Sequence, residues 1–190
     1  GLEGTELIWE GNKVRFGLTG RHNVRNALAA VAIARAIPVG SAAIREGLAS
    51  VKPLFGRSEI LRGAVTVIRD CYNANPESTD AAIAFCDDLE WPGRKVYVIG
   101  SMLELGDSSP AAHRAVGARL AASRADRVFL YGAETEAALE ALAGRAFHTN
   151  AMDALAEELK RYVRPGDLVL LKGSRGCALE RLGGVLTEAA

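Results

Sequence analysis

The feature that most constrains the fold is an alternation of short apolar runs with longer amphipathic stretches, beginning at residue 65 and continuing almost to the chain's end. The apolar runs predict strands at 65–70, 95–100, 127–131, 146–148 and 167–172. The stretches between and after them predict helices at 76–89, from 109–110 onward, and at 134–142, 151–163 and 177–188. Such alternation is typical of βαβ units. The sequence therefore predicts an α/β fold with a Rossmann-like, mostly parallel sheet flanked by helices.

The first part of the chain follows a different pattern. Two short alternating runs around Gly11-Asn12 predict a hairpin, and two helices are expected at 22–37 and 41–51. The first of these helices is small and apolar on most sides, which is typical of a buried helix. The pattern breaks at 52–56, so we place a domain boundary there, between residues 1–53 and 54–190. The first part is too short to bury a stable core of its own.

One stretch, residues 65–78, marks a candidate site. An apolar run ends at Asp70, a polar turn with Tyr72 and Asn73 follows, and Asn75-Pro76 is a favourable start for a helix. These side chains therefore lie at the carboxyl end of a strand, the edge where open α/β sheets bind ligands. The alternative is an ordinary strand-to-helix turn that contains an aspartate.

Two further loops at predicted strand ends are polar. The loop 101–107 carries Glu104 and a second carboxylate, and the loop 172–176 carries Lys172 and Arg175 between glycines. Glycines let backbone amides approach an anion, and a following helix N-terminus favours negative charge. These two cations are therefore candidates to hold a carboxylate or phosphate. The alternative is a surface turn with solvated charges.

Composition excludes several classes of function. The chain has 23 basic and 23 acidic residues and few aromatics, which gives no electrostatic case for binding nucleic acid. No apolar run is long enough for a membrane span, so no membrane partner is expected. Three scattered cysteines form neither a disulfide framework nor a metal-ligand pattern, which indicates a reducing, cytoplasmic compartment.

Common catalytic motifs are also missing from the sequence. It contains no GxxxxGK[ST] phosphate loop, no GxGxxG, no GxSxG and no HExxH. His113 lies within a predicted helix, where a structural hydrogen-bonding role is favoured over that of a base. No catalytic residue and no metal ligand therefore follow from spacing alone.

Five motifs taken together resemble those of the Mur ligases. They are Gly20-Arg21-His22-Asn23-Val24-Arg25-Asn26-Ala27-Leu28-Ala29-Ala30, Gly56-Arg57-Ser58-Glu59, Asp70-Cys71-Tyr72-Asn73-Ala74-Asn75-Pro76-Glu77-Ser78, Met102-Leu103-Glu104-Leu105-Gly106 and Lys172-Gly173-Ser174-Arg175. They occur in the family's order and cover most of the chain. The third and fifth resemble the forms found in the branch that adds D-alanyl-D-alanine to UDP-N-acetylmuramoyl-tripeptide.

The resemblance implies a reaction and a domain assignment. Residues 1–53 would be the end of the family's central ATPase domain, and 54–190 its carboxy-terminal Rossmann-like domain. ATP would phosphorylate the tripeptide carboxylate, and the amine of D-alanyl-D-alanine would attack the acyl phosphate, in peptidoglycan precursor synthesis. The phosphate loop, the Mg²⁺ ligands and the UDP-binding domain are expected upstream of residue 1, so the chain alone is expected to be inactive. The intact enzyme is expected to be a cytoplasmic monomer.

The resemblance also implies roles for individual residues. Asn23 and Asn26 would lie near the adenine. Arg57 would reach the ribose or phosphates of the nucleotide, Asp70 would accept hydrogen bonds from the ribose hydroxyls, and Tyr72 and Asn73 would line that site. Lys172, Ser174 and Arg175 would hold the carboxylate side of the dipeptide, and Glu104 would face its ammonium.

The sequence departs from the family pattern at two positions. Cys71 stands where serine is usual, and Ser101 where aspartate is usual. Two alternatives to this branch remain open at this point: a sister Mur ligase that adds another amino acid, and a non-catalytic α/β binding module.

Overall fold

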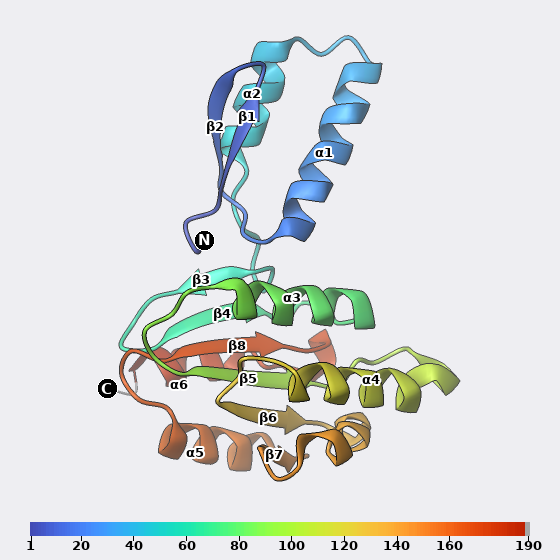
Figure 1. The fold of residues 1–190 in the computed structure, drawn as a ribbon, viewed down its shortest axis with the longest axis vertical. Helices are drawn as coiled ribbons and strands as arrows, with labels where there is room; N and C mark the ends of the chain where they lie inside the picture. The colour runs from blue at the N-terminus through green and yellow to red at the C-terminus, as the bar shows by residue number, and fades with distance from the viewer. Residues whose placement is uncertain (189–190) are drawn as a thin grey trace. The chain divides into compact units, whose positions relative to one another are not determined.

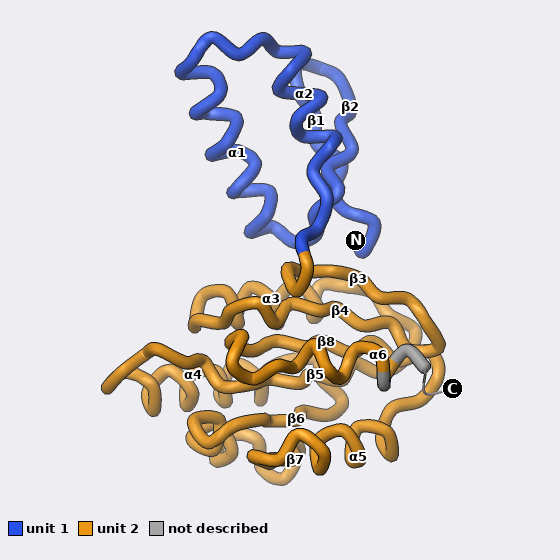
Figure 2. The backbone as a smooth tube through the Cα atoms, turned by 180° about the vertical axis from the view of Figure 1, so that it is seen from behind, with its two compact units in different colours: residues 1–54 blue, residues 55–190 orange. Residues whose placement is uncertain are grey.

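The structure, a computed structural model, describes residues 1–188. It divides into two compact units, residues 1–54 and residues 55–190, which Figure 2 shows in separate colours. The boundary expected from the sequence lies one residue earlier, and the last two residues of the expected second domain fall outside the described part of the chain.

Unit 1 contains the predicted hairpin and two helices, but the turn of the hairpin is Glu10-Gly11 rather than Gly11-Asn12, because Asn12 pairs with Trp9. The antiparallel strands β1 (Thr5–Trp9) and β2 (Asn12–Phe16) are followed by α1 (Arg21–Ala36) and α2 (Ser41–Ser50). A small apolar core joins them, formed by Val14, Phe16, Ala27, Val31, Ile44 and Leu48. Unit 1 thus has a small apolar core of its own, while the expectation that this part of the chain is too short for a stable core stays a prediction.

The prediction that the first helix is buried is wrong for unit 1 by itself. Only Ala27 and Val31 of α1 are buried, whereas the side chains of Leu28 and Ile33 are 62% and 66% exposed. The reason is that only one side of α1 faces the apolar core of unit 1. A helix that is apolar on most sides therefore presents an apolar face that this unit does not cover.

Unit 2 is built on a six-stranded sheet, in the order β3-β4-β8-β5-β6-β7. The strands are β3 (Glu59–Leu61), β4 (Thr66–Asp70), β5 (Lys95–Gly100), β6 (Arg127–Tyr131), β7 (Ala146–Thr149) and β8 (Leu168–Lys172). Among the pairings described within this six-stranded sheet, only the edge pairing β3–β4 is antiparallel. Every residue of β5 and β8 is buried, as expected for central strands covered on both faces. The predicted α/β class with a mostly parallel sheet is confirmed.

Helices cover both faces of this sheet (Figure 1). α3 (Pro76–Asp88) packs beside α4 (Ser109–Ala121), whereas α5 (Met152–Tyr162) packs beside α6 (Arg181–Glu188). The predicted start of α3 is confirmed in detail. The Asn75 side chain accepts a hydrogen bond from Ser78 N at 2.7 Å, the Ser78 hydroxyl accepts one from Asn75 N at 3.1 Å, and Pro76 is the first helical residue.

Three local predictions are wrong. Residues 134–142, expected as a helix, form two short 3₁₀ segments, η2 (Ala133–Ala138) and η3 (Glu140–Leu142), ended by Ala143 in the left-handed region. Asn150, which the sequence suggests as the cap of the helix expected at 151–163, does not cap α5, because the helix starts at Met152 and Ala151 is its N-cap residue. The last helix starts at Arg181, because Ala178 is left-handed and follows a 3₁₀ turn, η4 (Arg175–Cys177).

A close approach at Gly117 of α4 yields the first test of this packing. A Cβ at Gly117 would lie 2.5 Å from the Ala138 carbonyl oxygen and 2.8 Å from Ala138 Cα. Gly117→Ala is therefore expected to lower the free energy of unfolding by about 1–3 kcal/mol, although alanine normally favours helices. At Gly47 of α2 a Cβ meets nothing within 4 Å, so Gly47→Ala is expected to raise that free energy. Urea denaturation measures both; stabilisation by Gly117→Ala would contradict the close approach.

Candidate functional site

Three loops that the sequence analysis singled out come together at one edge of the sheet in unit 2. Because β8 lies between β4 and β5, the carboxyl ends of these parallel strands are neighbours. Lys172 pairs in register with Asp70 on one side and with Ile99 on the other. The loops 71–75, 101–105 and 173–176 therefore start side by side. This is the kind of edge where α/β sheets bind ligands.

An ion pair between Lys172 and Asp70 lies at this edge. Lys172 Nζ is 3.0 Å from Asp70 Oδ2 and also donates a hydrogen bond to the Asn73 carbonyl oxygen at 2.9 Å. The side chains of Lys172 and Asp70 are 3% and 17% exposed. A lysine buried to this extent needs a counter-ion. The charge of Lys172 is thus paired within the chain, and its ammonium also fixes the loop that carries Asn73.

Two arginine side chains, Arg57 and Arg175, lie against the Tyr72 ring at the same edge. The Arg57 guanidinium carbon lies 4.3 Å from the centroid of the Tyr72 ring, and that of Arg175 lies 5.4 Å from it, both within cation–π range. All three side chains are exposed. We refer to Arg57, Tyr72 and Arg175 as the arginine–tyrosine cluster. Guanidinium groups bind carboxylates and phosphates with two parallel hydrogen bonds, so this cluster can take an anion.

The loop after β5 is held against the loop after β8. Leu103 N donates to the Ser174 hydroxyl at 2.9 Å, and Met102 N donates to Nε2 of His113 at 3.0 Å. The other ring nitrogen of His113 lies 2.8 Å from a backbone carbonyl oxygen, so it carries the proton. The predicted structural role of His113 is confirmed. Glu104 follows these anchors, exposed and in the left-handed region with φ 65°.

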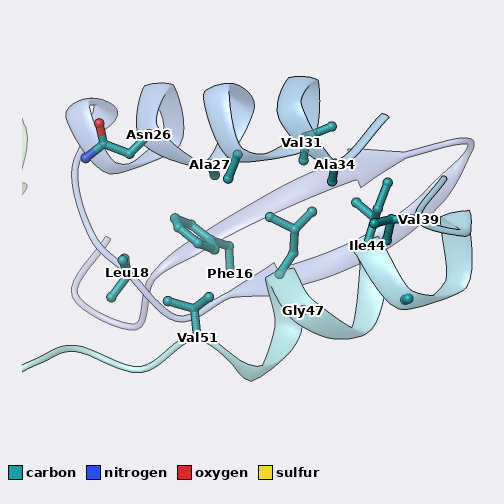
Figure 3. Close-up of a pocket in the computed structure, with 13 residues that line it drawn as sticks. Phe16, Leu18, Asn26, Ala27, Val31, Ala34, Val39, Ile44, Gly47 and Val51 are labelled. Carbon is teal, nitrogen blue, oxygen red and sulfur yellow. The ribbon is translucent and has the colours of Figure 1, made fainter. Parts of the chain in front are cut away.

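The two predicted adenine-side residues, Asn23 and Asn26, lie in unit 1. Asn23 Nδ2 donates to the Thr19 carbonyl oxygen at 2.8 Å, which ties the first turn of α1 to the residues before it. Asn26 lies near the start of α1 at one end of an apolar cavity of about 410 Å³, bordered by α1, α2 and the hairpin (Figure 3).

The sequence analysis missed a residue that positions Asp70. Ser58 N donates a hydrogen bond to Asp70 Oδ1 at 3.0 Å, so the two carboxylate oxygens of Asp70 have separate partners, Ser58 and Lys172. Ser58 has φ 50°, a conformation that few non-glycine residues adopt. The position of Ser58 between Arg57 and Glu59, within one of the five motifs, was the sequence signal that could have indicated its role. The backbone contact itself could not be read from side-chain types.

Cys71, one of the two departures from the family pattern, is buried behind the site. Its Sγ lies 3.9 Å from Glu180 Oε2. Burial, and then the nearby Glu180 carboxylate, raise the pKa of the Cys71 thiol from 9.0 to about 12. The other departure, Ser101, is 1% exposed, and its carbonyl oxygen accepts a hydrogen bond from Ser174 N at 3.1 Å.

The raised pKa of Cys71 predicts a loss of stability at alkaline pH. The thiol stays neutral in the folded chain but ionises in the unfolded chain above pH 9.0. The stability that the neutral thiol contributes to folding is therefore fully present below that pH and is lost as the pH rises toward about 12. Cys71→Ser cannot ionise in this range and should lose less stability on alkalinisation. Urea midpoints of both proteins across this range measure the effect; equal pH dependence would contradict it.

Within residues 1–188, no group of three or more histidine, cysteine, aspartate or glutamate side chains is arranged to hold a metal ion. None of the helices in that part of the chain has the length and apolar character needed to cross a membrane.

Comparison with known proteins places this geometry in context. Residues 56–175 match the family described as "Mur ligase, glutamate ligase domain". The UDP-N-acetylmuramoyl-tripeptide–D-alanyl-D-alanine ligase of Treponema pallidum is 41% identical over 99% of this chain and 42% of its own length. The enzyme of that name from Bacillus subtilis is 35% identical over 98% of this chain and 43% of its own. The chain thus spans less than half the length of these curated relatives.

Solved structures give the same result. MurF from Acinetobacter baumannii has a TM-score of 0.83 and 34% identity, covering 93% of this chain and 40% of that one. MurF from Thermotoga maritima in complex with ADP has a TM-score of 0.77 and 27% identity, covering 97% of this chain and 43% of that one. Since the family match alone extends over more than half of its residues, the chain belongs to the Mur ligase family.

Proposed function

We propose that this chain is the carboxy-terminal part of an ATP-dependent ligase that joins D-alanyl-D-alanine to UDP-N-acetylmuramoyl-tripeptide through an acyl phosphate. The observation that carries the proposal is the arginine–tyrosine cluster beside the Asp70–Lys172 pair, because this places fixed cations and a carboxylate at one sheet edge. Relatives with this activity in their names align along nearly the whole chain.

In this proposal the nucleotide lies on the β4 side of the edge. The exposed Arg57 contacts its phosphates or ribose, and Asp70 accepts hydrogen bonds from ribose hydroxyls with the lone pairs that its present partners leave free. Tyr72 and Asn73 line the same side. Asn23 and Asn26, carried by unit 1, are proposed to lie near the adenine.

The dipeptide lies on the β8 side. Arg175 is exposed, so we assign it the direct contact with the dipeptide carboxylate. Lys172 supports this side by fixing the neighbouring loop and by its remaining N–H. The Ser174 hydroxyl, which accepts from Leu103 N, keeps its own proton to donate. Glu104 is proposed to face the dipeptide ammonium.

The proposed reaction assigns binding and orientation to these residues. ATP transfers a phosphoryl group to the tripeptide carboxylate. The dipeptide amine then attacks the acyl carbon, a C–N bond forms, the C–O bond to phosphate breaks, and the amine releases a proton. Holding two reactants in one geometry contributes a large part of such a rate enhancement. The amine has to be presented to the acyl carbon by the β5 and β8 loops.

The remaining requirements are proposed to lie in the rest of a longer protein. Phosphoryl transfer needs a phosphate cradle and Mg²⁺, and the sequence has no phosphate loop. We therefore expect the 190-residue chain alone to release no phosphate from ATP. A cytoplasmic location is part of the proposal, because the described cysteines are all free and the nucleotide substrates belong to that compartment. The longer protein is proposed to act as a monomer.

The test measures ATP-dependent phosphate release by the longer natural protein, with UDP-N-acetylmuramoyl-tripeptide and one amine at a time. D-alanyl-D-alanine is expected to support turnover, whereas diaminopimelate, D-glutamate and L-alanine are not. Turnover with one of these single amino acids instead would assign a sister ligase. No turnover with any amine, together with retained ligand binding, would assign a non-catalytic module.

A further inference from the structure

A short turn at residues 55–58 carries Arg57 to the site, and its backbone is unusual. Gly56 and Ser58, on either side of Arg57, have φ values of 67° and 50°. A non-glycine residue in this region costs free energy and persists only where its surroundings hold it. A Cβ on Gly56 would lie 3.2 Å from Tyr72 N, so the turn also runs close to the loop after β4. Something must therefore hold this turn in place.

Glu59 supplies that restraint from the first residue of β3. Its Oε2 accepts hydrogen bonds from Arg69 Nη2 at 2.7 Å, from Arg69 Nε at 3.0 Å and from Gly56 N at 3.3 Å. The Arg69 guanidinium in turn lies 4.3 Å from the centroid of the Phe55 ring. The Glu59 and Arg69 side chains are 28% and 14% exposed. One carboxylate oxygen thus links the start of the turn to β4.

These restraints act on the turn that carries Arg57. Its side chain is exposed, and its guanidinium contacts the Tyr72 ring. The backbone around it is held by Tyr72 N donating to Gly56 O at 3.0 Å and by Ser58 N donating to Asp70 Oδ1 at 3.0 Å, and Glu59 adds a third restraint by accepting from Gly56 N. Glu59 therefore acts on Arg57 through the turn.

We infer that Glu59 is a positioning residue that holds Arg57 against Tyr72, and so sets the cation that receives the nucleotide. The inference rests on the proposed function for its enzymatic consequence, but its geometric part stands on this chain alone. Glu59→Ala removes the acceptor, while Glu59→Gln keeps a carbonyl oxygen that can still accept from Gly56 N. The two variants therefore separate positioning from the mere presence of the carboxylate charge.

The geometric test uses NMR on the 190-residue chain. Protons of Arg57 over the face of the Tyr72 ring are expected to be shifted upfield, and Tyr72→Leu identifies that shift. Glu59→Ala should abolish it and Glu59→Gln should largely preserve it. An unchanged upfield shift in folded Glu59→Ala overturns the inference, whatever the protein's activity. If Glu59→Ala does not fold, Arg69→Met provides the second variant: it removes two of the three hydrogen bonds that Glu59 accepts, together with the contact of Arg69 with Phe55, and an unchanged shift in it overturns the inference.

The enzymatic test uses the longer natural protein and a double-mutant cycle. Glu59→Ala is expected to raise KM for ATP about tenfold, as for loss of one charge-assisted contact, with a smaller change for Glu59→Gln. Once Arg57→Ala is present, adding Glu59→Ala should raise KM no further. A purely structural Glu59 would instead give additive effects, which overturns the inference. Absence of ligase activity in the unmutated protein would overturn the proposed function but leave the NMR result to decide on Glu59.

Discussion

Replacing Asp70 by asparagine is expected to lower the free energy of unfolding of unit 2 by about 3–5 kcal/mol. The substitution keeps the shape and can still accept from Ser58 N, but it leaves the Lys172 ammonium, whose side chain is 3% exposed, without its counter-ion. Urea denaturation of the 190-residue chain measures the loss. Trp91 lies in unit 2 and Trp9 in unit 1, so Trp91 fluorescence in a Trp9→Phe background reports on unit 2.

A matched control separates this effect from an ordinary charge change. Asp80 pairs with Arg119 at 2.8 Å, but its side chain is 61% exposed, so Asp80→Asn is expected to cost less than about 1 kcal/mol. In the Asp70→Asn background, Lys172→Met should restore most of the stability, because it removes the buried unpaired charge. Equal losses from Asp70→Asn and Asp80→Asn would contradict the account of this pair.

The second large effect concerns the two arginines on the Tyr72 ring. In the longer protein, Arg175→Ala is expected to raise KM for D-alanyl-D-alanine about 10- to 100-fold, the range for losing a hydrogen-bonded charge pair. KM for ATP should change little. Arg57→Ala should do the reverse, because we place Arg57 on the nucleotide side. Steady-state kinetics with each substrate varied in turn provide the measurement.

Each arginine variant serves as the control for the other, since both side chains are exposed cations near the same ring. A general loss of positive charge would raise both KM values in both variants. An effect of Arg175→Ala on ATP alone would show that the β8 loop belongs to the nucleotide, and would contradict the proposed division of the site.

Local sequence patterns predicted most elements of the fold because each strand and helix carries its own periodicity. They also placed Asp70 and Lys172 at strand ends. Their direct contact could not be predicted, since it depends on β8 inserting between β4 and β5, and strand order leaves no local pattern. The sequence pattern therefore predicted that Lys172 is a cation available to a ligand, whereas its charge is paired with Asp70 within the chain.

The predictions that were wrong also depended on tertiary contacts. Residues 134–142 have helical periodicity, but α4 approaches Ala138 closely at Gly117. This tertiary packing, rather than the local pattern, sets the 3₁₀ conformation of the segment. The first helix was expected to be buried, yet Leu28 and Ile33 of α1 are exposed, because an apolar pattern does not state which partner covers a face. The role of Glu59 was missed because it depends on a backbone N–H and on Arg69, neither of which a motif records.

The most direct test of the central claim locates the bound dipeptide on the longer protein. With the backbone amides labelled and assigned, D-alanyl-D-alanine is added in the presence of nucleotide and tripeptide substrate analogue. The account predicts that the largest chemical-shift changes fall at Leu103, Ser174 and Arg175, and that Arg175→Ala removes them. Changes confined to residues 1–54, with these three amides unmoved while the protein still forms product, would contradict it.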